Sequence, residues 1–175
     1  MLMYYIRFLR AMFTGSKATQ ITVGDETRFG FRCGPTECEY LRTMNGALII
    51  NLVEISEQYN NFRTRFFQTA VKNKIWPVTR RYWASYRRPI RIFQKGEVRT
   101  RLACWNEESV LWYSQVWVKG QLCAEVVAHV MVIDKKRKRG ITEIQRLMGK
   151  EVPSPPMPKE VAALLENHAL KYTVS

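Results

Sequence analysis

The sequence predicts an α+β fold in which a curved antiparallel sheet wraps one long central helix, with short helices added at the N- and C-termini. Three observations predict it: a strand-like segment near the start, one long apolar helical segment, and a series of long strand-like segments after that helix. A single buried helix followed by consecutive strands is accommodated best when the strands form an antiparallel sheet and the helix packs on one of its faces.

The first half of the chain supplies one strand and the long helix. Residues 27–34 (TRFGFRCG) form a strand-like segment that ends in a Gly-Pro turn. From Met44 to about Arg65 the apolar residues recur at helical spacing and cover a wide face, so this helix should be buried on most sides. A shorter helix is expected over residues 66–75, and the Trp-Pro pair that follows these residues should end it.

The second half of the chain supplies the sheet. Its apolar residues are mostly β-branched and lie mostly at even spacing, which is typical of strands, and a Lys-Gly turn joins the last two segments as a hairpin. A short helix near residues 141–148, a proline-rich link and a helix from Lys159 to about Leu170 are expected to follow. The four predicted strands cover residues 78–93, 96–105, 110–120 and 121–134.

The 175 residues divide into three segments. Residues 1–24 form a basic amphipathic segment, residues 25–135 the domain of helix and sheet, and residues 136–175 a basic turn, a short helix, the proline-rich link and a last helix. Hydrophobic residues make up 46% of the chain, which excludes wholesale disorder. The formal net charge of +13 favours an anionic partner such as nucleic acid, an anionic membrane surface or a phosphate-bearing ligand, although the same charge could serve solubility alone.

The N-terminal segment MLMYYIRFLRAMFTGSKATQ contains three basic residues, and no acidic residue precedes Asp25. Its apolar stretch is interrupted by Arg7 and is too short to span a bilayer. A basic, acid-free amphipathic start resembles a mitochondrial presequence, and on this basis we expect a mitochondrial protein. The alternatives are an interfacial helix that docks on lipid or on a partner, and a helix that packs on its own domain.

Metal chemistry is not expected from the sequence. The four cysteines, Cys33, Cys38, Cys104 and Cys123, form no Cys-x-x-Cys motif, and the two histidines are not placed as ligands beside them. Cys104 and Cys123 fall in strand-like segments, where a buried free thiol is the usual outcome. We predict neither a metal nor a resident cofactor.

The stretch PTECEYLRTMNGALI, Pro35–Ile49, carries the most specific motif. It resembles the signature of the thioesterase superfamily with the hot-dog fold, which is 4-hydroxybenzoyl-CoA thioesterase-like, and in particular the branch of thioesterase superfamily member six. That signature reads Pro-Ser/Thr-Asp-Cys-Asp, three residues, then His-Met-Asn-Asn-Ala-x-Tyr. Residues 96–118 and 151–165 resemble the strand pair and the C-terminal link and helix of the same branch. The resemblance implies the hot-dog fold over residues 27–170.

In active members of this superfamily, an acidic residue near the start of the helix acts as base or nucleophile on an acyl-CoA thioester. The resemblance places Glu39 in that role, with Asn45 and Gly46 beside it at the helix start. Such a site makes physical sense, because free N–H groups at a helix N-terminus stabilise an oxyanion and a carboxylate can activate water or attack directly. An acyl-CoA thioester is the substrate or ligand that the resemblance implies.

Around the expected site, the chain departs from the signature at four positions. Glu39 replaces aspartate, Thr43 replaces histidine, Gly46 replaces the second asparagine, and Ile49 replaces tyrosine. Glutamate is one methylene longer than aspartate, and a displacement of about 1 Å can cost on the order of 10²-fold in rate. We therefore expect a degenerate thioesterase-like protein that serves as a non-catalytic structural or binding subunit of a larger, mitochondrial assembly. The alternatives are an acyl-CoA thioesterase that uses Glu39, and a protein that binds acyl-CoA or an acyl carrier without hydrolysing it.

Two basic runs are candidates for phosphate contact. In the first, arginines alternate with aromatics between Arg80 and Arg91, which suits phosphate contact with stacking, but core aromatics with arginines outside would give the same pattern and are favoured here. The second follows the last strand and would meet the phosphates of CoA, RNA phosphate or an acidic protein, or would simply be solvated. The candidate contact residues are Arg80, Arg81, Arg87, Arg88, Lys135, Lys136, Arg137, Lys138 and Arg139.

The expected protein partners are of two kinds. Protein subunits of a large assembly are one, and a second copy of this chain is the other, since the resemblance implies a dimer in which the sheets pair. A subunit could instead use the same sheet edge for a different partner. The basic charge also favours contact with RNA or anionic lipid.

Overall fold

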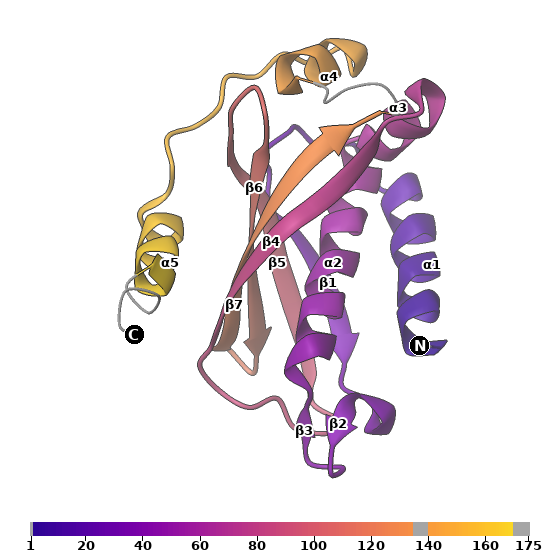
Figure 1. The fold of residues 1–175 in the computed structure, drawn as a ribbon. Helices are drawn as coiled ribbons and strands as arrows, with labels where there is room; N and C mark the ends of the chain where they lie inside the picture. Colours follow the sequence, from indigo (N-terminus) through magenta and orange to yellow (C-terminus); the bar gives the residue numbers. More distant parts are fainter. Residues whose placement is uncertain (1, 135–139, 170–175) are drawn as a thin grey trace.

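The computed structural model of the protein describes residues 2–134 and 140–169. The predicted α+β fold is confirmed: five strands form one antiparallel sheet, and a long helix lies along one of its faces (Figure 1). The elements in chain order are α1 (Leu2–Lys17), β1 (Thr27–Arg32), the 3-10 helix η1 (Pro35–Glu37), β2 (Cys38–Glu39), β3 (Thr43–Met44), α2 (Gly46–Arg63), α3 (Phe66–Asn73), β4 (Trp76–Tyr86), β5 (Lys95–Trp105), β6 (Val110–Val118), β7 (Gln121–Ile133), α4 (Ile141–Leu147) and α5 (Lys159–Ala169).

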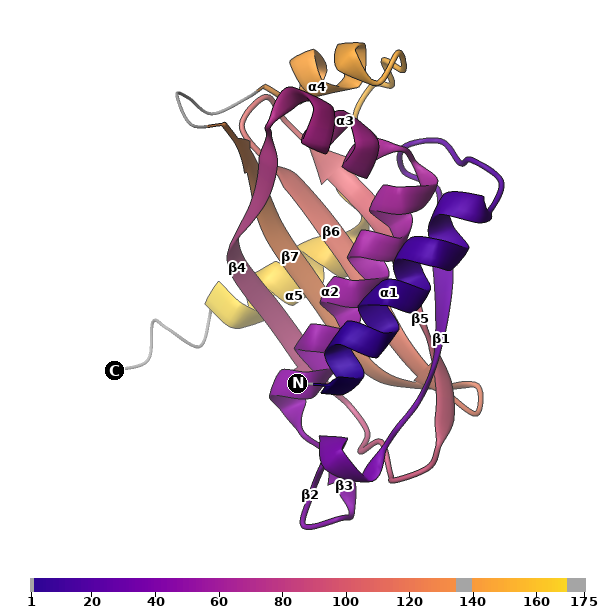
Figure 2. The ribbon, with the colours of Figure 1, turned by 90° about the vertical axis from the view of Figure 1, so that its right-hand side faces the viewer.

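The five-stranded sheet has the order β1-β5-β6-β7-β4, and each neighbouring pair is antiparallel. β6 and β7 form the predicted hairpin, whose turn residues Lys119 and Gly120 both have positive φ. β1 and β4 are the two edges of the sheet. Figure 2 shows α1 and α2 on one side of the sheet and α5 on the other.

The central helix α2 has a defined start and end. Asn45 caps its N-terminus, because the side-chain oxygen accepts a hydrogen bond from the Ala47 N–H at 2.8 Å. At its C-terminus, the Thr64 hydroxyl donates to the Asn60 carbonyl at 3.1 Å, and Arg65 then takes a left-handed φ of 68° that breaks the helix before α3. These caps limit the long predicted helix to Gly46–Arg63.

The main core lies between α2 and the sheet, and buried polar bonds run through it. Thr100 Oγ1 donates to Ser56 Oγ at 2.8 Å and lies 2.9 Å from Ser114 Oγ, while Asn60 Nδ2 donates to Thr27 Oγ1 at 3.2 Å. Since buried polar groups need partners, these bonds fix the position of α2 along the sheet. The fully buried apolar residues of this core include Leu52, Val53, Ile55, Val98, Val116 and Val126.

The basic N-terminal segment forms α1, which packs along α2 (Figure 2). Ala11 is fully buried in the main core, and the ring centroids of Phe8 and Phe62 lie 6.0 Å apart. Gly15 permits the close approach, because a Cβ there would come within 2.9 Å of the Phe62 Cβ. The helix therefore packs on its own domain, while mitochondrial targeting stays a prediction.

The two C-terminal helices cover other parts of the sheet. α4 lies over one end, where Ile141 and Ile144 pack with Trp112. α5 covers the face opposite α2, where Val161 and Leu164 pack against Tyr113 and neighbouring residues. None of the helices in the described ranges is both long and apolar enough to span a membrane.

The predicted boundaries of β4 are wrong at both ends. Pro77 lies inside the strand, paired with Val132, instead of stopping the preceding helix. A proline is tolerated there because β4 is an edge strand, which leaves one side without ladder hydrogen bonds. The strand predicted to reach Phe93 ends at Tyr86. After it, the backbone N–H groups of Arg87 and Arg88 both donate to the Cys123 carbonyl. The sequence also fails to predict the two-residue strands β2 and β3.

Candidate functional site

The three candidate residues of the resemblance, Glu39, Asn45 and Gly46, lie together at the start of α2. Asn45 Nδ2 donates a hydrogen bond to Glu39 Oε1 at 2.5 Å, and Asn45 Oδ1 accepts one from the Ala47 N–H at 2.8 Å. One asparagine therefore caps the helix and also holds the glutamate beside the helix start. Glu39 itself is exposed, so a ligand can reach its carboxylate.

A tight hairpin carries Glu39. β2 pairs with β3, which places Glu39 opposite Thr43. The turn residues Tyr40 and Leu41 have positive φ values of 48° and 55°, a conformation that is costly for residues other than glycine. Their side chains are 95% and 68% exposed. The turn thus presents two apolar side chains to solvent next to the carboxylate.

Gly46, the first residue of α2, offers a backbone donor. Its carbonyl accepts a hydrogen bond from the Tyr86 hydroxyl at 3.2 Å, whereas no partner of its N–H is found among the described residues. A free N–H at a helix N-terminus lies at the positive end of the helix dipole. The site therefore combines an exposed carboxylate with a donor suited to a developing negative charge.

Glu37 holds the backbone of this site in place through buried hydrogen bonds. It is buried, its backbone carbonyl accepts from the Asn45 N–H at 2.9 Å, and its Oε2 accepts from the Gly34 N–H at 2.7 Å and from Arg7 Nη2 at 2.8 Å. Sequence reasoning misses this role, because Arg7 lies 30 residues earlier in a segment that reads as a presequence. Glu37 is thus a positioning residue that ties the turn to α1 and to the cap of α2.

Two of the positions that depart from the signature have different surroundings. Ile49 is 5% exposed and belongs to the main core, so an apolar residue fits there without any ligand. Thr43 is half-buried and stands opposite Glu39 in the hairpin. Of these two changes, the one at Thr43 therefore alters the surroundings of the carboxylate more directly.

The candidate arginines around β4 lie in two separate places. Arg80 and Arg81 are exposed in the middle of the strand, where its pairing with β7 is irregular between Thr79 and Arg81. Arg87 and Arg88 directly follow the last residue of the strand and are also exposed. At about 3.3 Å per residue, Arg80 and Arg87 stand roughly 20 Å apart along the chain. The four arginines therefore do not form one phosphate site. The candidate residues 135–139 lie outside the described residues.

The aromatic residues of this arginine-rich run pack against core clusters. Tyr82 packs against the buried residues on the α2 side of the sheet, and Trp83 packs against the cluster that α5 covers. The arginines around them are exposed, and the Arg81 guanidinium lies 5.6 Å from the centre of the Trp83 ring. This is the arrangement of core aromatics with arginines outside.

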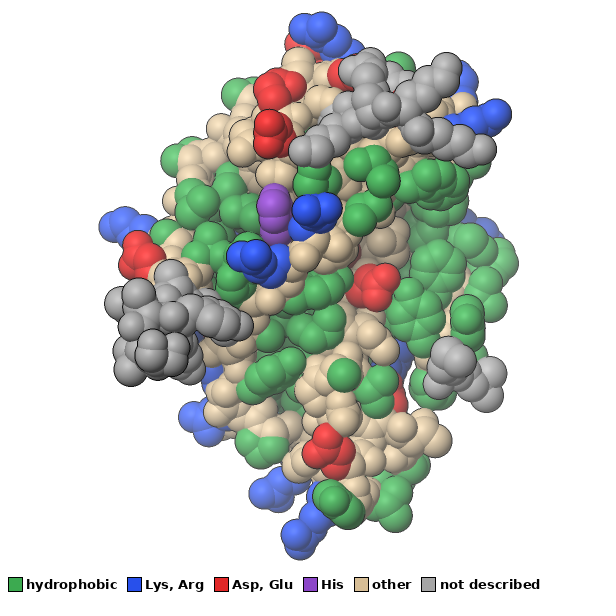
Figure 3. Space-filling view, in the orientation of Figure 1, with side chains coloured by type: hydrophobic (Ala, Val, Ile, Leu, Met, Phe, Trp, Pro, Cys, Tyr) green, Lys and Arg blue, Asp and Glu red, His purple; other side chains and the backbone are tan. Residues whose placement is uncertain are grey.

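The end of β4 that carries Arg87 and Arg88 is the end nearest to the start of α2. Tyr86 reaches Gly46 there, and Thr43 forms an isolated bridge with Arg91. Figure 3 shows Lys and Arg side chains at this lower end of the molecule. The exposed basic residues that the hairpin and the end of β4 bring to it are Arg42, Arg87, Arg88 and Arg91.

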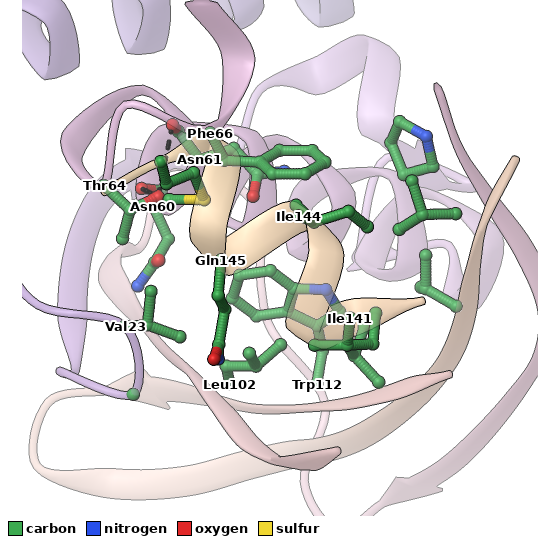
Figure 4. A pocket seen from close by; sticks show the side chains of 16 residues that line it. Val23, Asn60, Asn61, Thr64, Phe66, Leu102, Trp112, Ile141, Ile144 and Gln145 are labelled. Atoms are coloured by element: carbon green, nitrogen blue, oxygen red, sulfur yellow. Dashed lines mark hydrogen bonds between the residues drawn. The ribbon is translucent and has the colours of Figure 1, made fainter. Parts of the chain in front are cut away.

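A cavity lies near the other end of α2, under α4 (Figure 4). It has a volume of about 70 Å³ and is lined mainly by apolar side chains of the sheet and of α4. Glu39, Asn45 and Gly46 do not line it. The cavity is therefore separate from the hairpin and the N-terminus of α2.

A buried carboxyl group lies midway along α2. Glu57 is 4% exposed, and its Oε1 has no hydrogen-bond partner among the described residues. Burial, and next the charge of the neighbouring Glu54, raise the pKa of Glu57 to about 8. Burial also raises the pKa of Glu54, against the effect of the hydrogen bond from Tyr4. Glu57 stands about 16 Å along the helix from Gly46, so it is not part of the hairpin site.

The cysteines are free thiols, and two of them lie in contact. Cys33 Sγ and Cys38 Sγ are 3.3 Å apart, at the two ends of the turn that contains η1. In the part of the chain that the structure describes, no group of three or more His, Cys, Asp or Glu residues could hold a metal ion.

Comparisons with known proteins identify relatives of this chain. The sequence model of the thioesterase-like superfamily matches residues 33–165. Among solved structures, the probable thioesterase YbaW from Escherichia coli is 17% identical, with a TM-score of 0.64 over 69% of this chain and 95% of that one. Slr0204, a 1,4-dihydroxy-2-naphthoyl-CoA thioesterase from Synechocystis, is 7% identical, with a TM-score of 0.61 over 71% and 95%.

A third solved structure covers more of this chain. The protein SAV2348 from Staphylococcus aureus, solved in complex with CoA, is 9% identical, with a TM-score of 0.56 over 86% of this chain and 87% of that one. At such identities the likeness shows the fold alone. The particular branch of the superfamily stays a prediction.

Proposed function

The chain belongs to the thioesterase-like superfamily and has its hot-dog fold, and on this premise we propose that it hydrolyses an acyl thioester at the N-terminus of α2, with Glu39 as general base. The observation that carries the proposal is the hydrogen bond from Asn45 to Glu39 at 2.5 Å, which holds an exposed carboxylate beside the helix start. The free Gly46 N–H supplies a donor at the same place. Asn45 acts as a positioning residue.

The proposed step uses one water molecule. Glu39 takes a proton from the water as its oxygen bonds to the thioester carbonyl carbon. The carbonyl oxygen becomes an oxyanion, to which the Gly46 N–H donates. When the oxyanion collapses, the carbon–sulfur bond breaks with its electron pair on sulfur, and the proton held by Glu39 passes to the leaving thiolate. The products are a carboxylic acid and a thiol.

We further propose that the thiol is CoA. Arg42, Arg88 and Arg91 are exposed at the end of the molecule where the hairpin lies, and arginines suit the phosphates of a nucleotide. The CoA complex of SAV2348 and the substrate of Slr0204 support this choice for proteins of the same fold. A homodimer through the exposed edge of β4 is part of the proposal, since that edge places Tyr86, a neighbour of Gly46, at the subunit boundary.

The test is thiol release from acyl-CoA substrates of different chain length by the purified protein. Glu39→Gln removes the base and keeps the acceptor for Asn45, and we expect a loss on the order of 10²–10⁴-fold in kcat. Glu26→Gln is the matched control, because Glu26 is an exposed acid that pairs with Arg28 on the surface. Equal rates for Glu39→Gln and wild type would overturn the proposal.

A second candidate function is a non-catalytic subunit of a larger, mitochondrial assembly. The observation that favours it is the strained turn that exposes Tyr40 and Leu41, since exposed large apolar residues mark interaction sites. Gentle purification from the native cells, with sizing and mass spectrometry, tests it. This function would be favoured over hydrolysis by a large particle that contains the protein and releases no thiol from acyl-CoA. The Tyr40→Ser/Leu41→Ser variant should then be missing from the particle.

A further inference from the structure

The cavity under α4 is bounded by elements that come from far apart in the chain. Its walls are the C-terminal end of α2, the ends of β5, β6 and β7, and α4 (Figure 4). Trp112 and Leu102 line it from the sheet, while Ile141 and Ile144 line it from α4. No charged residue is among the described residues that line it. Such a cavity suits a neutral, mainly apolar group.

One polar atom in the wall of this cavity lacks a hydrogen-bond partner among the described residues. Gln145 is 5% exposed and lines the cavity from α4 (Figure 4). Its Oε1 accepts a hydrogen bond from the Val152 N–H at 3.2 Å, whereas its buried Nε2 has no hydrogen-bond partner among the described residues. Because the Val152 N–H can only donate, the oxygen of the amide must face it, and the NH₂ group is left on the other side.

Three other polar side chains in the wall already use their donors. Asn60 Nδ2 donates to the Asp25 carbonyl at 3.1 Å and to Thr27 Oγ1 at 3.2 Å. Asn61 Nδ2 donates to Gln58, and the Thr64 hydroxyl donates to backbone carbonyls of α2. Gln145 Nε2 is the buried donor in this wall that still needs an acceptor among the described residues. A buried donor without an acceptor lowers the stability of the protein. A ligand that supplies an acceptor removes this cost, which favours its binding.

We propose that this cavity is a ligand site for a small neutral molecule, or the end of a larger one, that carries one carbonyl oxygen on an apolar body. One water-sized group needs roughly 10–15 Å³ on the scale of this volume, so the cavity holds about five or six heavy atoms. The apolar atoms lie against Trp112 and Leu102, and the carbonyl oxygen accepts from Gln145 Nε2.

This ligand site goes beyond the proposed hydrolysis. Gly46 and Asn60 lie about 21 Å apart along α2 at 1.5 Å per residue, and Leu52, Val53 and Ile55, all at most 1% exposed, fill the interior between them. A short acyl-CoA reacting at Glu39 would not reach Gln145. The two proposals can therefore fail separately.

The test uses two probes of equal shape, cyclopentanone and methylenecyclopentane, added to ¹⁵N-labelled full-length protein. We expect both to shift the signals of the cavity, and cyclopentanone to bind roughly three- to tenfold more tightly because only it accepts a hydrogen bond. Cyclopentanone alone should move the Gln145 side-chain NH₂ signals downfield. Equal affinities, unmoved Gln145 signals, or no shift at the solubility limit of either probe would each overturn the proposal.

Two variants of the cavity complete the experiment. Gln145→Met keeps the size and removes the donor, so the preference for cyclopentanone should disappear while methylenecyclopentane still binds. Val130→Phe fills the space from the sheet side, because Val130 lines the cavity at 4% exposure, and neither probe should bind. A Gln145→Met protein that keeps the preference would contradict the role of Nε2 even if the other variant fails to fold.

Discussion

Arg7 on α1 and Glu37 in the turn before α2 form a buried bidentate ion pair. Arg7 Nη2 donates to Glu37 Oε2 at 2.8 Å, Nη1 donates to Oε1, and the two side chains are 8% and 6% exposed. Arg7 Nη2 also donates to the Arg32 carbonyl at the end of β1, at 2.6 Å. The pair therefore joins α1, β1 and the turn that carries the candidate site.

Removing one member of this pair should be costly. Arg7→Met leaves a buried carboxylate without its partner, and we expect the free energy of unfolding to fall by about 3–5 kcal/mol. Urea denaturation, monitored by circular dichroism, measures this free energy. The double variant Arg7→Met/Glu37→Gln should recover part of the loss, since no unpaired charge remains. A loss below about 0.5 kcal/mol in the single variant would show that the pair does not hold α1 in place.

The ion pair also bears on the presequence prediction. Cleavage near residue 24 would remove Arg7 and Ala11 and expose the face of α2 that α1 covers. We expect a protein that starts at residue 25 to be much less stable than the full chain. Mass spectrometry of the N-terminus of the protein from its native cells shows which form exists, and a mature form without α1 would contradict the structural role of that helix.

The oxyanion donor can be removed without breaking α2. Proline is accepted at the first position of a helix, where its missing N–H has no helical partner, and the extended ψ of 138° at Asn45 is compatible with it. We expect Gly46→Pro to lower kcat by on the order of 10²–10³-fold relative to Gly46→Ala, which adds the same Cβ near Tyr86 but keeps the N–H. Equal rates for the two variants would remove Gly46 from the mechanism.

Glu57 should make stability depend on pH. Its folded pKa of about 8 lies above the ordinary value of 4.5 because it is buried and near Glu54. The folded state therefore holds a proton that the unfolded state has lost, so stability is complete below about pH 4.5 and falls as the pH rises towards 8. The slope for one proton is on the order of 1.4 kcal/mol per pH unit.

Glu57→Gln tests this directly, because glutamine mimics the protonated acid. We expect the variant to lose that fall in stability between pH 5 and pH 8 and to be the more stable protein at pH 8. Chemical denaturation at each pH gives both curves. Parallel curves for the two proteins would mean that Glu57 is not the group responsible.

Cys33 and Cys38 should form a disulfide when the protein is oxidised. Their sulfur atoms are 3.3 Å apart, and Cys38 is the more exposed of the two. Burial, and next the contact with Cys38, raise the pKa of the Cys33 thiol to about 12, so closure should be slow near neutral pH and faster as the pH rises. Oxidised glutathione should remove two titratable thiols and the mass of two hydrogen atoms. A lasting mixed disulfide at Cys38, with Cys33 still reduced, would be the opposite result.

Local patterns in the sequence were sufficient for much of the fold. Even spacing of apolar residues predicts β5, β6 and β7 within a residue or two, and helical spacing predicts α2 with about two extra residues at each end. The start of β4 escapes prediction because the Trp-Pro pair is interpreted as the end of the preceding helix, and only the edge position of the strand makes Pro77 acceptable inside it. That position is a property of the whole sheet.

The site was predicted less completely for a similar reason. Glu39 is found through the motif, but its bond to Asn45 depends on a hairpin whose turn residues, Tyr40 and Leu41, favour no such turn by type. The Arg7 partner of Glu37 lies 30 residues away. The separation of Arg80 from Arg88 depends on where β4 ends, which the arginine pattern does not show.

The most direct test of the account is a single turnover in ¹⁸O-water, with enzyme in excess over an acyl-CoA substrate. If Glu39 acts as a base on water, the released acid carries the label and the peptide that contains Glu39 carries none. Label in Glu39 would show that the carboxylate attacks the thioester itself. A thioester that stays intact over the same period would contradict hydrolysis altogether and leave the subunit function as the explanation of the site.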